Sequence, residues 1–214
     1  MSISRDQILT RACEMYLEGG LDGFSMRRLA RSLDVTAPAL YRHYEGKEAL
    51  LRDVIDEAFK MFGAFLYRAL AGLTAQERLR MTGEGYLAFA LEHPRLYQVI
   101  HVSPELLGFD DLPADVTRQA CATGQFLVDR VRECMDADVL AGDDPQAVAT
   151  TIWAFSHGLV SLYLDGVLTL DRDAFLAVFH SSFARLFAGI AGPAFKPPAA
   201  AAADPISFAP GQLR

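Results

Sequence analysis

The chain has 214 residues, 51% hydrophobic and 22% charged, with a formal net charge of −7. This composition is ordinary for a globular protein and excludes a chain that is disordered throughout. We expect no membrane span, since no apolar run of about 18 residues lacks a charge, glycine or proline. We also expect no signal peptide, since residues 1–11 are polar. The three cysteines (Cys13, Cys121 and Cys134) fit no metal or disulfide spacing, which favours a reducing cytoplasm.

Positive charge is concentrated near the N-terminus. From Met61 onward anions outnumber cations by 17 to 11. Residues 24–47 instead carry five cations and only two anions, Asp34 and Glu45. The cations are Arg27, Arg28, Arg31, Arg42 and Lys47. The total charge argues against nucleic-acid binding, but the distribution of charge matters more than the total.

Apolar residues at helical spacing dominate the first part of the chain. They predict a helix over about residues 4–18, ended by a pair of glycines. Ser25 is expected to cap a second helix. Thr36-Ala37-Pro38 is expected to begin a short third helix that ends near Tyr44, because proline is well accommodated in a first helical turn. A long fourth helix is expected to begin at Lys47.

The rest of the chain is also predicted to be helical. The expected helices lie at about residues 74–93, 94–102, 113–137, 145–167 and 172–191. Asp144 and Asp171 are the expected N-caps of the last two. We expect a loop over residues 103–112 and a flexible tail rich in alanine and proline from Pro193. The predicted fold class is all-α, with a helix-turn-helix DNA-binding domain over residues 1–46, a larger helical ligand-binding and dimerisation domain over 47–192, and the tail over 193–214.

The second and third helices together have the features of a helix-turn-helix. They are short, they are separated by a tight turn, and their exposed side is basic. The expected buried face consists of Leu29, Ala30, Leu33, Val35 and Leu40.

These residues resemble the DNA-binding domain of TetR-family transcriptional regulators over about residues 6–55. The resemblance is carried by Phe24-Ser25-Met26-Arg27-Arg28-Leu29-Ala30, by Val35 through Tyr44, and by Gly46 through Leu51. Its most specific part is Leu40-Tyr41-Arg42-His43-Tyr44 followed by Lys47. Further along, Trp153-Ala154-Phe155-Ser156-His157-Gly158 is similar to the tryptophan-histidine-glycine signature of one TetR C-terminal subgroup.

The resemblance implies that the third helix lies in the major groove of double-stranded DNA. Arg42 is expected to recognise guanine with two hydrogen bonds, and Tyr41, His43 and Lys47 to contact phosphates. The full set of implied DNA contacts is Ser25, Arg27, Thr36, Ala37, Pro38, Tyr41, Arg42, His43 and Lys47. The alternative is a solvated basic face. Tyr44 is expected to be a core residue between the third and fourth helices.

The resemblance also implies a cavity for a small hydrophobic or amphipathic effector between the middle helices. The candidate lining residues are Tyr97, His101, Phe126, Trp153 and His157. The alternative for each of them is core packing. The histidines have no metal-ligand spacing and no catalytic arrangement is evident, so we expect no metal, no cofactor and no enzymatic activity.

TetR-like proteins dimerise through their last two helices, and a palindromic operator needs two recognition helices. The expected homodimer interface is Gly158, Tyr163, Ala174, Phe175, Val178, Phe179 and Leu186. Packing within one chain is the alternative. The sequence thus predicts a cytoplasmic repressor that an effector releases from DNA. The competing hypotheses are a constitutive regulator without an effector and a small-molecule-binding protein whose helix-turn-helix is vestigial.

Overall fold

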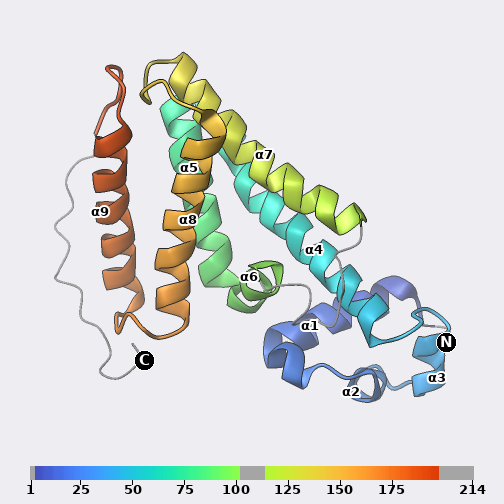
Figure 1. Cartoon of the computed structure of the whole chain (residues 1–214). Coiled ribbons are helices and arrows are strands. Elements are labelled where there is room, and N and C mark those ends of the chain that lie inside the picture. The colour runs from blue at the N-terminus through green and yellow to red at the C-terminus, as the bar shows by residue number, and fades with distance from the viewer. Residues whose placement is uncertain (1–2, 102–113, 198–214) are drawn as a thin grey trace. The chain divides into compact units, whose positions relative to one another are not determined.

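The computed structural model describes residues 3–101 and 114–197, and every named element in these ranges is a helix (Figure 1). The α-helices are α1 (Arg5–Gly23), α2 (Met26–Ser32), α3 (Ala37–Tyr41), α4 (Lys47–Tyr67), α5 (Ala75–Glu92), α6 (Pro94–His101), α7 (Ala114–Asp136), α8 (Pro145–Leu164) and α9 (Arg172–Ile190). A short 3-10 helix, η1 (Arg68–Ala71), follows α4. The predicted all-α class is confirmed. The loop expected over residues 103–112 lies outside the described residues.

Side-chain caps fix where several helices begin. The Ser25 hydroxyl accepts a hydrogen bond from the backbone N–H of Arg28 at the start of α2. Asp144 caps α8 and Asp171 caps α9 in the same way. Each cap satisfies a backbone N–H that has no partner within the helix. These three predicted caps are therefore confirmed.

Two helix ends differ in part from the prediction. The expected end of the first helix at Gly19-Gly20 coincides with a break at Gly20, whose φ is 60°, but a further short helical stretch continues α1 to Gly23. Glycine adopts this left-handed conformation without steric cost, so the chain turns and then resumes the helix. The end of α3 comes at Tyr41, earlier than expected near Tyr44. The backbone N–H groups of His43 and Tyr44 both bond to the Leu40 carbonyl and close the helix.

The chain divides into two compact units. The divisions between them fall at other positions than the expected domain boundary after residue 46. The first unit comprises residues 1–65 and 88–123, and the second comprises 66–87 and 124–214. The first unit therefore contains α1, α2, α3 and α6 together with most of α4. Helix α1 contacts both α2 and α6, and α2 contacts α3.

The first unit has a continuous apolar core under the helix-turn-helix. Ile8, Leu29, Leu40 and Leu50 are each at most 1% exposed. Ala30 is buried as expected, whereas Leu33 and Val35 are only half-buried. An aromatic cluster in the same unit joins α4, α5 and α6. It consists of Phe62, Phe65, Phe89, His93, Tyr97 and His101, with ring centroids 4.4 to 6.5 Å apart.

In the second unit α8 and α9 lie side by side and antiparallel (Figure 1). Edge-to-face packing of Phe155 on α8 against Phe183 on α9 joins the pair, with centroids 5.3 Å apart. After α9 the chain crosses the segment between α7 and α8, where Ala191 pairs with Leu140. Gly192 is required at this crossing, because a Cβ there would lie 2.3 Å from the Asp138 carbonyl oxygen. The first residues of the expected tail are held as well, because the backbone N–H groups of Ala194 and Lys196 donate to the Asp138 carbonyl and to Oε1 of Gln76. Residues 198–214 lie outside the described part.

One described helix, α8, is long and apolar enough to cross a membrane, judged by length and composition. Its most apolar window is only 28% buried within the chain. The helix begins with the Asp144 cap and lies beside α9 (Figure 1).

Candidate nucleic-acid interface

Helix α3 presents one face to the core and the other to solvent. Ala39 and Leu40 are buried, with Leu40 completely enclosed. Pro38, Tyr41 and Arg42 are exposed, and 52% of Tyr41 is accessible. A tyrosine so accessible at the end of a helix contributes little to the core. The exposed face of α3 is therefore accessible to a binding partner.

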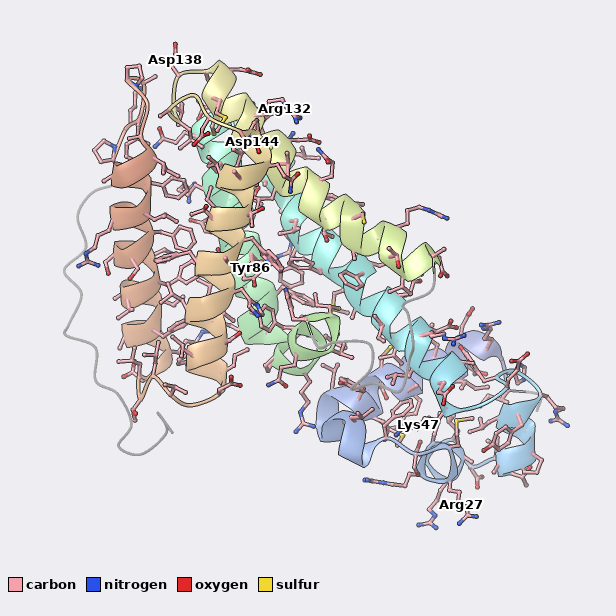
Figure 2. The ribbon with its side chains drawn as sticks, in the orientation of Figure 1. Arg27, Lys47, Tyr86, Arg132, Asp138 and Asp144 are labelled. Carbon is pink, nitrogen blue, oxygen red and sulfur yellow. The ribbon has the colours of Figure 1, made fainter. Side chains whose placement is uncertain are left out.

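The remaining predicted DNA contacts differ in how exposed they are. Thr36 is exposed at the N-terminus of α3, whereas Ala37 and His43 are half-buried. Ser25 is half-buried, and its hydroxyl caps α2. Arg27 is exposed and projects away from α2 (Figure 2).

Lys47 is exposed in the first turn of α4, and its ammonium nitrogen lies 6.0 Å from the centroid of the Phe24 ring. This cation–π contact draws the side chain from α4 toward the residues that precede α2. The structure thus brings Lys47 near the segment that carries Ser25 and Arg27, although it stands 20 or so positions further along the sequence.

Two exposed cations on α2, Arg28 and Arg31, were not among the predicted contacts. Their positive charge was evident in the sequence, but nothing in the pattern separated them from ordinary solvated arginines. With Arg27, Arg42 and Lys47 they make five exposed cations on α2, in the turn after α3 and in the first turn of α4. Such a concentration of positive charge suits a polyanion.

Tyr44 follows α3 and is only 2% exposed. Its hydroxyl donates a hydrogen bond of 2.9 Å to Oδ2 of Asp53 on α4. Burial raises the pKa of Tyr44 to about 12, so the phenol stays protonated at neutral pH. The prediction that Tyr44 is a core residue is confirmed. Its polar partner was not predicted, because Asp53 looks like any exposed acid on a helix.

The predicted effector residues fall into different units. Tyr97 and His101 belong to the aromatic cluster of the first unit, where their rings lie 4.4 Å apart. In the second unit the His157 ring lies 6.0 Å from that of Trp153, which is 47% exposed. Phe126 of the same unit contacts Tyr67, and the Arg130 guanidinium lies 4.7 Å over its ring. All five residues stay candidates, each within its own unit.

His157 has polar neighbours that the sequence did not reveal. Its Nδ1 lies 3.4 Å from the Tyr86 hydroxyl, and its Nε2 lies 3.5 Å from the Ser161 hydroxyl. Burial lowers the pKa of His157, with Asp165 acting weakly in the opposite direction. The imidazole is therefore neutral at neutral pH and has a hydroxyl beside each ring nitrogen.

An open groove of about 250 Å³ lies in the first unit. It is lined by Arg5, Ala49, Arg52, Asp53, Asp56, Asp115 and Val116. No predicted effector residue lines this groove. Five of its seven lining residues carry charged side chains, whereas a typical small-molecule site has only a few polar groups.

The predicted dimer residues divide into buried and partly accessible ones. Phe175, Val178 and Phe179 are at most 3% exposed within their own chain. The side chains of these three residues therefore pack within their own chain and are not accessible to a partner. Gly158, Tyr163, Ala174 and Leu186 are half-buried. A Cβ added at Gly158 would meet nothing within 4 Å, so this glycine faces open space.

The exposed side of α8 and α9 offers other contact residues. Trp153 and Leu162 on α8 are 47% and 38% exposed. Ala154 on α8 and Ala188 on α9 are exposed as well. Large apolar side chains beside small residues allow close helix packing against another surface.

Two short helices, a tight turn and an exposed basic face define a helix-turn-helix DNA-binding protein. The model for bacterial regulatory proteins of the tetR family matches residues 8–54, and the model for the tetracyclin repressor-like C-terminal domain matches residues 79–186. The chain belongs to the TetR family of transcriptional regulators, which are not enzymes.

Relatives of known name agree with this assignment. The HTH-type transcriptional repressor KstR2 of Mycolicibacterium smegmatis is 32% identical over 51% of this chain and 53% of its own length. The chain spans about half the length, or less, of the curated relatives that it matches first.

Solved structures share the fold. A protein of unknown function from Rhodococcus sp. RHA1 is 26% identical, with a TM-score of 0.76 over 86% of this chain and 93% of its own. AibR, solved in complex with isovaleryl coenzyme A and operator DNA, is 20% identical, with a TM-score of 0.59 over 75% of this chain and 85% of its own. At that identity AibR supports the fold alone.

Proposed function

We propose that this regulator is a cytoplasmic, homodimeric repressor that binds a palindromic operator through α3 and is released by a small effector. The observation that carries the proposal is the division of α3 into two faces. Ala39 and Leu40 anchor the helix, and Pro38, Tyr41 and Arg42 are left to contact DNA. An arginine that donates two hydrogen bonds to guanine discriminates between bases by about 1–3 kcal/mol.

The basic residues around α3 support binding to the DNA backbone. Lys47, His43 and Tyr41 are assigned to phosphates, and Ser25 and Arg27 to the backbone or a flanking base. Thr36, Ala37 and Pro38 are assigned to base edges, where the two apolar residues suit a thymine methyl group. The phosphate contacts fix the register of the helix in the groove.

A homodimer is proposed because two recognition helices must reach major grooves about 34–36 Å apart. We assign the contact to the exposed side of α8 and α9. Gly158 and Ala154 permit close approach there, and Trp153 and Leu162 supply apolar area. Tyr163, Ala174 and Leu186 flank this surface, and the buried Phe175, Val178 and Phe179 support it from beneath.

Release by an effector is proposed as a shift between two populations. The named precedents are a repressor, KstR2, and AibR, whose complex contains an acyl coenzyme A and operator DNA. In this chain α6, with Tyr97 and His101, belongs to the same compact unit as α1 to α3. An effector that prefers one position of α6 thereby changes DNA affinity, and a tenfold change needs about 1.4 kcal/mol of coupling.

The proposal is tested by selecting binding sites from random double-stranded DNA with the purified protein. We expect a palindromic motif from the wild type and a weakened or lost motif from Tyr41→Ala. Tyr67→Ala is the matched control, because Tyr67 is also an exposed tyrosine, 45% accessible, but lies outside α1 to α3. No enrichment by folded protein, before and after unfolding and refolding to remove bound ligand, would contradict the proposal. A compound that then raises the melting temperature and weakens operator binding identifies the effector class.

A further inference from the structure

Three side chains from separate elements meet beside the recognition helix. Oδ2 of Asp53 on α4 accepts hydrogen bonds from the Tyr44 hydroxyl at 2.9 Å and from Nη2 of Arg5 on α1 at 3.0 Å. The Arg5 guanidinium also lies 4.7 Å over the Tyr44 ring. We call Arg5, Tyr44 and Asp53 the clamp. All three residues belong to the first compact unit.

The Tyr44 hydroxyl is not needed to fill the core. A phenylalanine ring would occupy almost the same buried volume without a polar group. A buried hydroxyl loses its water and regains that free energy only if it finds a partner in the protein. Tyr44 finds a carboxylate, which is a stronger acceptor than a neutral group and holds the donor in a defined direction. The hydroxyl therefore orients Tyr44 as well as burying it.

The orientation of Tyr44 is transmitted to α3 through a tight turn. The backbone N–H groups of His43 and Tyr44 both donate to the Leu40 carbonyl, at 2.9 and 3.0 Å. These bonds join Tyr44 to the last turn of α3, which carries Tyr41. The clamp thus holds the C-terminal end of α3 at a fixed place against α4 and α1.

We propose that Arg5, Tyr44 and Asp53 are positioning residues for operator recognition. The clamp holds α3 in position and thereby orients Arg42 toward a base pair. This inference rests on the proposed role of α3 in DNA binding. Phosphate contacts tolerate a small displacement of a helix, whereas a two-bond contact to a base edge does not. Loss of the clamp therefore weakens binding to the operator more than binding to unrelated DNA.

The clamp can be broken without unfolding the protein. Arg5 and Asp53 have side-chain exposures of 59% and 31%, and ion pairs this accessible contribute little to stability. In Tyr44→Phe, Asp53 keeps its bond to Arg5, so no charge is left unpaired. The substitution also leaves the net charge unchanged, which keeps the electrostatic part of DNA binding the same.

The test compares Tyr44→Phe with Tyr16→Phe. Tyr16 is a tyrosine of α1 in the same unit, 5% exposed and packed against Phe24 with centroids 6.3 Å apart. For each variant we would measure the dissociation constant for the DNA selected by the wild type, the constant for a scrambled duplex of equal length, and the salt dependence of both. We expect Tyr44→Phe to weaken operator binding about 5-fold or more. Scrambled-DNA binding and the salt slope should stay within about twofold of Tyr16→Phe.

A second variant weakens the clamp without changing Tyr44 itself. Arg5→Lys keeps the positive charge but loses the planar fork that both reaches Asp53 and covers the ring. Each single variant raises the dissociation constant for the operator by some factor. If the residues act together, the double variant Tyr44→Phe with Arg5→Lys raises that constant by less than the product of the two factors.

Two outcomes would overturn the positioning role. In one, Tyr44→Phe binds the operator as Tyr16→Phe does. In the other, its operator and scrambled-DNA affinities fall by the same factor, as expected from a smaller folded fraction. Tyr41→Ala is measured in parallel. If that variant also binds the operator normally, the assignment of α3 to DNA is itself wrong, and the positioning role is wrong with it.

Discussion

The ring of Tyr163 on α8 stacks on the ring of Phe175 on α9, with centroids 3.9 Å apart and planes 5° from parallel. Phe175 is completely buried, and Phe179 and Phe183 continue the aromatic contacts along α9. The two helices are thus joined by side chains that face one another within one chain. A partner subunit has only their outward side to contact.

The first prediction concerns the stability of this helix pair. Phe175→Ala removes a fully buried ring and should lower the free energy of unfolding by about 3–5 kcal/mol. Thermal and urea unfolding followed by circular dichroism measure the change. Phe195→Ala is the control, because Phe195 is a half-buried phenylalanine beyond the end of α9. Equal losses of unfolding free energy in the two variants would show that burial of Phe175 does not stabilise the helix pair.

The second prediction tests the proposed dimer surface. Gly158→Arg fits a single chain, because a Cβ at this position meets nothing within 4 Å, and arginine favours helix more than glycine does. We expect the variant to be a folded monomer with weakened operator binding. Sedimentation velocity gives the oligomeric state. Gly124→Arg is matched to it, since Gly124 is an exposed glycine of α7 with equally open surroundings. If the Gly158→Arg variant is still a dimer, the interface does not include Gly158.

The third prediction concerns base recognition. Arg42→Ala should relax the base preference at one position of each half-site, because a two-bond contact to guanine is lost. The DNA motif selected by the variant is compared with that of the wild type. Arg31→Ala removes the same exposed charge from α2 and should leave the motif as it is. An identical motif from Arg42→Ala would show that this residue does not contact a base.

The fourth prediction concerns the DNA backbone. Lys47→Ala should weaken binding to all sequences alike and lower the slope of log affinity against log salt by about 1 per monomer. Affinities at several salt concentrations on operator and scrambled DNA measure both effects. A changed motif with an unchanged slope would contradict a phosphate contact by Lys47.

The fifth prediction concerns pH. Because burial lowers the pKa of His157, the folded state binds its proton less readily than the unfolded chain, where the value is near 6.5. The contribution of His157 to stability is therefore complete above about pH 6.5 and is lost as the pH falls through the interval down to its lowered value. His157→Gln should flatten the fall of unfolding free energy on acidification. His180→Gln, on the exposed side of α9, is the control, and an equal slope in wild type and His157→Gln would exclude this origin.

The sequence by itself determined the helices and the family. Caps such as Ser25, Asp144 and Asp171 act on N–H groups two or three residues away, and the helical period of apolar residues is equally local. The TetR motif around Tyr41 and Lys47 is also contained in one short stretch. Interactions of this range are determined by neighbouring residues, so they can be recognised before the chain is folded.

The tertiary structure decided which side of each element is buried and which distant groups meet. Phe175, Val178 and Phe179 have the spacing of either an internal face or a dimer face, and only the position of α8 shows that they face inward. Arg5 and Asp53 are 48 residues apart, and their meeting at Tyr44 follows no sequence pattern. The physical reason is that burial and long-range pairing depend on how helices pack together, and packing is a property of the whole unit.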